Sequence, residues 1–466
     1  MQKVTIVGGG MAGSEAALQL ARRGIAVRLV EMRPKRQTEA HQSDGFAELV
    51  CSNSFRGNAL PNAVGLLKEE MRRAGGVLMR LAEDAAVPAG GALAVDRDRF
   101  SDLVSRAIEQ EDLIEIVRDE ITELPDQDSP TILATGPLTS SKLAQALIDA
   151  TGEDQLYFYD SIAPIIDAES IDRSIVFAQS RYDKSGTPDY LNCPMTEAEY
   201  VRFIEAVKSA DQVVARDFED ASFFEACLPI EISANRGLDT LRFGPMKPVG
   251  LIDPRTGKEP WAVVQLRMEN REGSAYNMVG FQSRMKWGQQ KEIFRTIPGL
   301  ENAEFLRFGS IHRNTFLHGP EVLNDELGLK THPHIYLAGQ ITGSEGYVEA
   351  QAMGLVLGQY LAAKLKGTPI EMPPAETALG GLIRHVTGQL AFDPSDYQPS
   401  NITWAMMPTI PKRKIRKKAL RRLAAAERAL EALETWLQTQ EAVGLRLEGF
   451  VSRTIEDAHA ERVRRR

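Results

Sequence analysis

Cysteine is scarce in this chain of 466 residues, and its three cysteines, Cys51, Cys193 and Cys227, lie far apart. They form no Cys-x-x-Cys pair, which argues against disulfide-exchange chemistry and against a disulfide framework. A reducing, cytoplasmic compartment is therefore expected. The sequence also lacks an apolar run close to the roughly 18 residues that a membrane helix needs, and its first residues do not have the pattern of a signal peptide.

Several catalytic motifs are missing as well. Seven histidines are present, but no His-Glu-x-x-His motif accompanies them, so no metal site is expected. The chain has no Gly-x-Ser-x-Gly nucleophile elbow and no Walker loop. Its chemistry is therefore expected to come from a bound organic cofactor, assisted by a thiol or a carboxylate.

A dinucleotide-binding pattern begins near the N-terminus. An apolar run at residues 4–7 is followed by a helical pattern over residues 14–23, with Gly8, Gly9, Gly10, Met11, Ala12 and Gly13 between them. In this Gly-x-Gly-x-x-Gly spacing the first glycine permits a tight turn, the second lets the backbone approach a pyrophosphate, and the third lets helix and strand pack closely. A second apolar strand over residues 26–30 ends at Glu31, where a carboxylate would bind the adenosine ribose.

Two later segments favour FAD over NAD as the tightly held cofactor. A buried-strand pattern over residues 131–134 ends in Thr135 and Gly136, as is found beside the flavin in two-dinucleotide flavoproteins. Near the C-terminus another strand pattern leads through a glycine-rich turn into a helix, whose N-terminus would point at the flavin. Its candidate cofactor-binding residues are Gly339, Gln340, Gly343, Glu345, Gly346 and Tyr347. Gln340 stands where many such enzymes have an aspartate.

These patterns predict an α/β fold: a Rossmann-like FAD-binding domain of the two-dinucleotide flavoprotein type, with an inserted smaller α+β domain and a basic helical C-terminus. More proline, alternating apolar residues and turn signals mark the insertion at residues 188–295. The FAD-binding domain is then expected in two parts, residues 1–187 and 296–411. The C-terminal segment 412–466 has leucines at helical spacing.

The formal net charge of −9 hides two basic regions. Residues 412–466 contain 15 Lys and Arg against 8 Asp and Glu, and residues 236–286 contain nine against five, with aromatic residues between them. The candidate RNA-binding residues are Arg242, Lys247, Arg284 and Lys286 in the middle of the chain and Lys412, Arg413, Lys414, Arg416 and Lys417 in the tail. Solvated helix faces and ordinary core aromatics explain the same patterns without RNA.

Cys51 is the thiol nearest to the dinucleotide motif. A free thiol has a pKa near ~8.5, so it needs a cation, a helix N-terminus or a base nearby to react at neutral pH. Arg56, five residues further on, is one such cation. The alternative for Cys51, as for Cys227, is a small buried hydrophobic residue.

Long stretches of the sequence resemble the folate- and FAD-dependent tRNA (uracil-5-)-methyltransferases of bacteria. They cover residues 8–16, 49–57, 65–72, 133–140, 190–195, 227–231, 241–251, 276–282 and 339–349 and reach the basic cluster after Pro411. Residues after about Glu441 have no such resemblance. These stretches are far more specific than a glycine fingerprint.

The resemblance implies an enzyme that uses FAD, with 5,10-methylenetetrahydrofolate and NAD(P)H as cosubstrates, to methylate C5 of the T-loop uridine of tRNA. It implies catalytic roles for Cys51 and Cys227, one adding to uracil C6 and the other acting as acid or base at C5, in either order. Alternatively, N5 of the reduced flavin carries the one-carbon unit and a cysteine only transfers a proton. The basic insertion and tail would hold tRNA phosphates, and the target base would be extruded from its loop.

Three other functions remain open at this point. The same reaction on a ribosomal RNA uridine keeps the chemistry and changes the substrate. The related, larger FAD proteins that modify the tRNA wobble uridine are disfavoured by the short length of this chain and by its folate-family stretches. A small-molecule FAD dehydrogenase would make the basic tail incidental.

Overall fold

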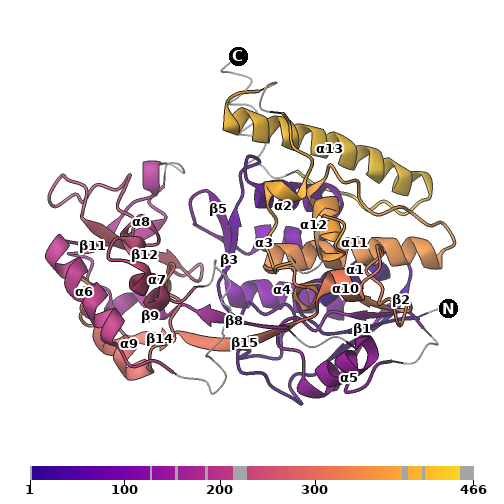
Figure 1. Cartoon of the computed structure of the whole chain (residues 1–466), viewed down its shortest axis with the longest axis horizontal. Coiled ribbons are helices and arrows are strands. Elements are labelled where there is room, and N and C mark those ends of the chain that lie inside the picture. The colour runs from indigo at the N-terminus through magenta and orange to yellow at the C-terminus, as the bar shows by residue number, and fades with distance from the viewer. Residues whose placement is uncertain are drawn as a thin grey trace.

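The computed structural model describes residues 3–125, 129–152, 156–183, 187–213, 228–390, 397–411 and 415–451. Figure 1 shows two bodies side by side, a larger one that contains both the N-terminal strands and the C-terminal helix and a smaller one formed by the middle of the chain. Each body has its own main cluster of buried apolar side chains.

The larger body is built on a parallel sheet of five strands in the order β16-β7-β1-β2-β6. The strands are β1 (Lys3–Val7), β2 (Ala26–Glu31), β6 (Ile114–Arg118), β7 (Thr131–Leu133) and β16 (Ile335–Leu337). β16 pairs with β7, so the strand expected near residue 335 joins the N-terminal unit across two hundred positions of sequence. The predicted Rossmann-like α/β sheet is confirmed.

Helices and a small antiparallel sheet complete this body. α1 (Met11–Ala21) and α11 (Tyr347–Leu365) approach closely because Gly354 has no side chain. A Cβ at this position would lie only 2.2 Å from the carbonyl oxygen of Ala12. The other helices are α2 (Ala63–Arg73), α3 (Val77–Asp84), α4 (Arg97–Glu109), α5 (Ser141–Thr151), α10 (Gly319–Val322), α12 (Ala378–Val386), α13 (Lys418–Ala442) and the 3-10 turns η5 (Gln340–Thr342) and η7 (Trp404–Met406). The small sheet, ordered β3-β5-β4, contains β3 (Ser54–Gly57), β4 (Ala86–Val87) and β5 (Ala92–Val95).

The first helix begins earlier than its apolar pattern indicates. α1 starts at Met11, inside the glycine motif, whereas the pattern spans residues 14–23. Glycines and small residues have no apolar periodicity to read, although the backbone after Gly10 is already helical. Gly24 has the left-handed φ of +76° expected of a residue that ends a helix.

The smaller body is built on an antiparallel sheet in the order β10-β11-β12-β13-β9-β14. The strands are β9 (Ile165–Asp167), β10 (Phe177–Ala178), β11 (Tyr190–Met195), β12 (Ala262–Met268), β13 (Ala275–Met278) and β14 (Phe305–Arg307). The helices are α6 (Glu197–Ser209), α7 (Ile230–Arg236), α8 (Thr240–Phe243) and α9 (Trp287–Phe294), with 3-10 turns η1 (Ala168–Ser170) and η2 (Arg181–Asp183).

This sheet extends beyond the insertion expected at residues 188–295. β9 and β10 precede that range and β14 follows it, and strands of two or three residues are too short to show a periodic pattern. Two long antiparallel strands, β8 (Leu156–Ile162) and β15 (Ser310–Phe316), run between the bodies (Figure 1). We propose this pair of strands as the domain boundary.

The helix expected after Pro411 is present as α13. Leu433, Trp436 and Leu437 of this helix are buried in the core of the larger body, whereas Leu420 in its first turn is exposed. In the described ranges, no helix is both long and apolar enough to cross a membrane. The same ranges contain no group of three or more His, Cys, Asp or Glu side chains that could hold a metal ion.

α2 buries four charged side chains, Lys68, Glu69, Glu70 and Arg72. Glu70 caps another helix: its two carboxyl oxygens accept hydrogen bonds from the backbone N–H groups of Ala378 (2.8 Å) and Leu379 (2.9 Å), at the start of α12. Burial nevertheless raises the pKa of Glu70 to about 8, because the two hydrogen bonds only partly offset the loss of hydration.

We expect Glu70 to make stability depend on pH. Its folded-state pKa is raised above the value of about 4.5 for an exposed glutamate, so the folded protein holds a proton that the unfolded chain releases. The contribution of Glu70 to the free energy of unfolding therefore falls as pH rises from about 4.5 to about 8. Glu70→Gln cannot titrate, and melting temperatures of both proteins between pH 5 and pH 9 should show a flatter curve for the variant. Parallel curves would contradict this prediction.

Candidate active site

A cleft enclosing about 1020 Å³ of open space lies at the carboxyl ends of β1, β2, β7 and β16. This edge is where parallel α/β sheets bind nucleotides. Eleven of the predicted cofactor residues line it: Gly8, Gly10, Met11, Ala12, Glu31, Thr135, Gly136, Gly339, Gln340, Gly346 and Tyr347. The cleft brings the three predicted flavin segments together.

The glycines of the first turn lie between β1 and α1, where their spacing predicts them. Gly8 has φ +104°, and a Cβ there would meet the carbonyl oxygen of Ala134 at 2.5 Å. A Cβ on Gly13 would lie 1.9 Å from the carbonyl oxygen of Gly8, so this glycine permits the close packing of α1 on β1. A Cβ on Gly10 would meet nothing within 4 Å, because that position faces the open cleft. The space in front of the α1 N-terminus therefore suits a pyrophosphate.

Four of the predicted cofactor residues do not line this cleft. The Cα of Gly9 faces the Phe46 ring, and Gly13 lies in the contact between helix and strand. Gly343 shapes the turn with φ +83°, against the Tyr397 ring. Glu345 lines a neighbouring cavity instead, where its carboxylate accepts a hydrogen bond from Gln340 at 2.9 Å. Spacing along the chain does not distinguish residues that shape the turn from residues that face the cleft.

Glu31 lines the cleft at the carboxyl end of β2, where hydrogen bonds fix its side chain. Its carboxylate accepts hydrogen bonds from the backbone N–H of Gly9 (2.8 Å) and from the backbone N–H (3.0 Å) and Nε (2.9 Å) of Arg33. Burial alone would raise the pKa of Glu31, but the hydrogen bonds and the charge of Arg33 outweigh it and lower the pKa. Glu31 is therefore an ionised acceptor, suited to the hydroxyl groups of a ribose.

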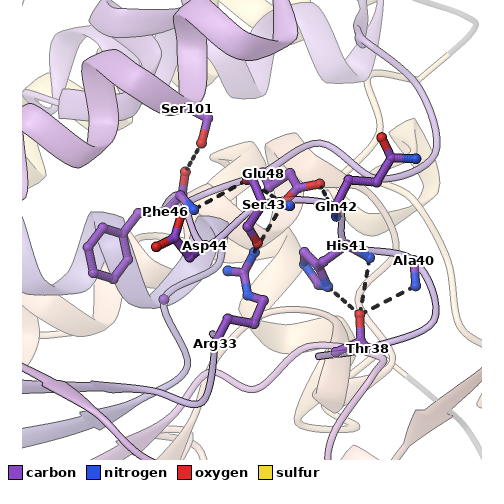
Figure 2. A network of polar contacts seen from close by, with 12 residues as sticks. Arg33, Thr38, Ala40, His41, Gln42, Ser43, Asp44, Phe46, Glu48 and Ser101 are labelled. Carbon is purple, nitrogen blue, oxygen red and sulfur yellow. Dashed lines mark hydrogen bonds and ion pairs between the residues drawn. The ribbon is translucent and has the colours of Figure 1, made fainter. Parts of the chain in front are cut away.

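The loop after β2 forms one wall of the cleft, although no pattern in the sequence predicts it. Figure 2 shows that Arg33 reaches across the loop to Glu48. The Glu48 carboxylate also accepts from the backbone N–H groups of Gln42 (2.8 Å) and Ser43 (3.0 Å), which ties the loop into a compact turn. Thr38, His41 and Glu48 line the cleft with Arg33. Polar loop residues have no periodic or motif signal that would have identified them.

Cys51 lines a second, open cavity that adjoins the first and comprises about 970 Å³ of space, part of it open to solvent. The two cavities share Val50, Pro137, Leu138, Gln340, Gly346 and Tyr347 as lining residues. The Tyr347 hydroxyl accepts a hydrogen bond from the backbone N–H of Cys51 (2.9 Å) and lies 3.0 Å from its Sγ. Burial, together with the neighbouring thiol, raises the pKa of Tyr347 well above its usual value, so the hydroxyl keeps its proton. It can therefore donate to the sulfur.

Two arginines, one from each body, hold the segment around Cys51. Arg97 of α4 donates to the carbonyl oxygen of Leu49 (2.6 Å). Arg267 of β12 donates to Ser52 Oγ (3.0 Å) and to Asn53 Oδ1 (2.9 Å). The smaller body thus contributes directly to the position of the thiol.

The other two cysteines differ in position. Cys227 lies outside the described residues. Cys193 is fully buried in β11, where loss of hydration raises the pKa of its thiol. Its environment is that of an inert core residue.

The predicted RNA-binding cations lie in two regions. On the smaller body, the Arg242 guanidinium lies 4.2 Å from the centre of the Trp261 ring, and the exposed Lys286 ammonium lies 3.2 Å from Asp211. Lys247 and Arg284 are half-buried there. Arg416 and Lys417 are exposed immediately before α13, and Lys412, Arg413 and Lys414 lie outside the described residues. Their role in binding RNA stays a prediction.

The contact between Tyr347 and Cys51 can be tested directly. Tyr347→Phe keeps the ring but removes the hydroxyl that stabilises the thiolate, so alkylation of Cys51 at neutral pH should slow about tenfold. Mass spectrometry of the Cys51 peptide after iodoacetamide treatment measures the rate. Tyr336→Phe, which removes a hydroxyl that accepts a hydrogen bond from Lys364, is the matched control. Equal rates in both variants and the wild type would contradict a role for the hydroxyl.

Comparison with known proteins shows which family and which fold this chain shares. The sequence profile of the family described as Glucose inhibited division protein A matches residues 3–369. The solved structure of Aquifex aeolicus GidA in its form II crystal superimposes with a TM-score of 0.65, covering 99% of this chain and 76% of that chain, at 16% identity. That identity is too low to compare activities, but the TM-score shows that the two proteins share a fold.

Three curated relatives are much more similar in sequence. Each is named methylenetetrahydrofolate--tRNA-(uracil-5-)-methyltransferase TrmFO. The protein of Geobacter sulfurreducens is 54% identical over 94% of this chain and 99% of its own length, and that of Desulfotalea psychrophila is 53% identical over 94% and 97%. The protein of Staphylococcus aureus strain Newman is 52% identical over 94% and 99%. The chain therefore belongs to the methylenetetrahydrofolate--tRNA-(uracil-5-)-methyltransferase family, within the wider family of glucose-inhibited division protein A.

Proposed function

We infer that this chain is an FAD-dependent enzyme that methylates C5 of a uracil in tRNA, with methylenetetrahydrofolate as the one-carbon donor and NAD(P)H as the electron source. The observation that carries this inference is the identity of 54% to a methyltransferase of that name over almost the whole length of both proteins. The site supports it, because a cavity containing Cys51 adjoins a dinucleotide cleft. Within tRNA, we propose the T-loop uridine as the target and 5-methyluridine as the product.

The cleft residues fit FAD. Gly10 leaves room for a pyrophosphate at the α1 N-terminus, and the ionised Glu31 suits the adenosine ribose. Thr135, Gly136, Gly339 and Gln340 also line the cleft, and Gln340 lines the cavity of Cys51 as well, so the isoalloxazine would lie where the two meet. Reduced FAD supplies the electrons that convert a one-carbon unit at the methylene oxidation level into a methyl group.

The thiols supply the uracil chemistry in this proposal. C5 of uracil is a weak nucleophile, and a thiolate that adds to C6 turns the ring into an enolate with C5 as its nucleophilic carbon. Cys51 lies in the cavity beside the flavin end, with a hydroxyl donor 3.0 Å from its sulfur, and is a candidate for this addition or for proton transfer at C5. Cys227 is the candidate for the other role.

Binding of a large, anionic substrate is part of the same proposal. A T-loop base is stacked inside the tRNA elbow, so it must be extruded to enter the cavity beside Cys51. Lys286 and the half-buried cations on the smaller body, with the exposed cations before α13, would bind tRNA phosphates, which would make the affinity depend on salt. Because its proposed substrate is tRNA, we propose that the enzyme works in the cytoplasm.

One assay tests the function. Purified yellow protein is incubated with NADPH, methylenetetrahydrofolate labelled in its one-carbon unit, and an unmodified tRNA transcript. Label in 5-methyluridine of the T-loop is expected, and a transcript with cytidine at that position should stay unlabelled. Label in ribosomal RNA alone would select the alternative substrate. NADPH turnover without label in any RNA would contradict methyl transfer.

A further inference from the structure

Arg56 lies five residues after Cys51 in an unusual backbone conformation. It belongs to β3 and has φ +61°, a left-handed value that residues with a Cβ rarely adopt. The buried amino group of Lys68 donates to the carbonyl oxygens of Phe55 (3.2 Å) and Arg56 (3.0 Å) on both sides of this distortion. Burial lowers the pKa of Lys68 well below its usual value, so the side chain acts here as a hydrogen-bond donor that fixes two carbonyl groups. These hydrogen bonds hold the left-handed conformation of Arg56 against its steric cost.

The distorted backbone brings the Arg56 side chain to the first turn of α11. Its Nη2 lies 2.5 Å from both carboxylate oxygens of Glu349, whose side chain is fully buried, whereas the Arg56 side chain is 34% exposed. Glu349 also accepts a hydrogen bond from the backbone N–H of Ile402 (2.8 Å), which fixes the carboxylate. The same Nη2 lies close to Gly346, at 3.4 Å from where a Cβ would stand, and Gly346 lines both cavities.

The Arg56 guanidinium is thus fixed through Nη2 by Glu349, while the Arg56 side chain lines the cavity. Arg56 and Cys51 line the same cavity. Among the described residues, Nε and Nη1 of Arg56 make no hydrogen bond, so these donors are available to a molecule in the cavity. A fixed, partly desolvated donor beside the thiol is the arrangement that stabilises charge developing on a substrate oxygen.

We propose that Arg56 is a catalytic residue that hydrogen-bonds O4 of the target uracil and stabilises its enolate, with Glu349 and Lys68 as positioning residues. This proposal rests on the function proposed above. When the thiolate adds, the S–C6 bond forms, the C5=C6 π electrons move to C4=C5, and the C4=O4 π electrons become negative charge on O4. The enolate appears again when C5, after bonding to the one-carbon unit, loses its proton to a base.

The pairing with Glu349 favours a carbonyl over a full anion as the ligand. The buried carboxylate already neutralises the guanidinium, so a phosphate or a folate carboxylate would meet its negative charge at short range. A uracil carbonyl is neutral when it binds and gains charge only during reaction. The pair therefore binds the substrate weakly and the enolate strongly, which increases the rate rather than the affinity.

Thio-substituted tRNA tests the contact. Wild type, Arg56→Gln and Arg56→Lys are assayed with transcripts carrying uridine, 4-thiouridine or 2-thiouridine at the target position. Arg56→Gln should lower kcat on uridine about 100-fold or more, with little change in the KM for tRNA or for methylenetetrahydrofolate. Sulfur at position 4 weakens the acceptor, so 4-thiouridine should slow the wild type and have at least about tenfold less effect in Arg56→Gln. The effect of 2-thiouridine should be equal in both enzymes, and Arg56→Lys should recover only part of the rate.

Two results would overturn the proposed role of Arg56. Equal 4-thiouridine effects in the wild type and in Arg56→Gln would overturn it. A raised KM for methylenetetrahydrofolate with unchanged kcat would also overturn it and assign the contact to folate. Flavin absorbance and Arg446→Gln, which breaks an Arg–Glu pair with Glu434 outside both cavities, control for folding. Absence of wild-type activity on uridine tRNA would instead contradict the proposed function.

Discussion

Cys51→Ala is expected to lower methyl transfer to tRNA by about 10²- to 10⁴-fold, the range that a removed acid, base or nucleophile produces. FAD should stay bound, because Cys51 lines the second cavity and not the dinucleotide cleft. Single-turnover incorporation of label from methylenetetrahydrofolate into tRNA measures the loss, and flavin absorbance of the purified protein measures the cofactor. The same result is expected for Cys227→Ala.

Cys193→Ala provides the matched control for loss of a thiol. Its sulfur is buried in the core of the smaller body, away from both cavities, so activity should be retained and stability should fall by ~1 kcal/mol. Full activity in both Cys51→Ala and Cys227→Ala would show that no thiol takes part in the reaction. A colourless Cys51→Ala protein would instead assign Cys51 to cofactor binding.

Gly10→Ala is expected to give a folded protein without FAD. A Cβ at this position meets no atom within 4 Å, and the backbone angles of φ −77° and ψ −163° are accessible to alanine, so the fold should tolerate it. The added methyl group occupies the space in front of the α1 N-terminus where the pyrophosphate must approach. The purified variant should be colourless, and added FAD should no longer raise its melting temperature.

Gly288→Ala is the control for this substitution. Gly288 also has open space around its Cα, but it lies in α9 of the smaller body. The variant should be yellow, active and at least as stable as the wild type, since alanine favours a helix more than glycine does. A Gly10→Ala protein that retained FAD and activity would show that the cofactor does not pass in front of this helix.

The local part of the site could be read from the sequence because its signals are local. The roles of Gly8, Gly10 and Gly13 follow from their spacing after a strand, and Glu31 follows from the length of one βαβ unit. Apolar strand patterns that end in a glycine turn indicate the segments around Thr135 and Gly339. Such patterns arise because each residue type is required by the conformation of its own few neighbours.

Other parts left no local signal. The wall formed by Arg33 and Glu48 is held by hydrogen bonds within a polar loop that has no motif. The sheet of the smaller body takes short strands from outside residues 188–295, since a strand of three residues shows no period and is defined by its partners. Arg267 reaches the Cys51 segment from the other body, a contact that no property of β12 alone predicts.

The sequence by itself determined the cofactor class, the family resemblance and the residues that could react. Only the tertiary structure decided which of them meet. The Tyr347 hydroxyl contacts Cys51, which is 296 positions away in the sequence, and the Glu349 carboxylate contacts Arg56, which is 293 positions away. The physical reason is that glycine turns and helix periods are set by neighbours in the chain, whereas the position of a reactive side chain is set by packing between elements that are distant in sequence.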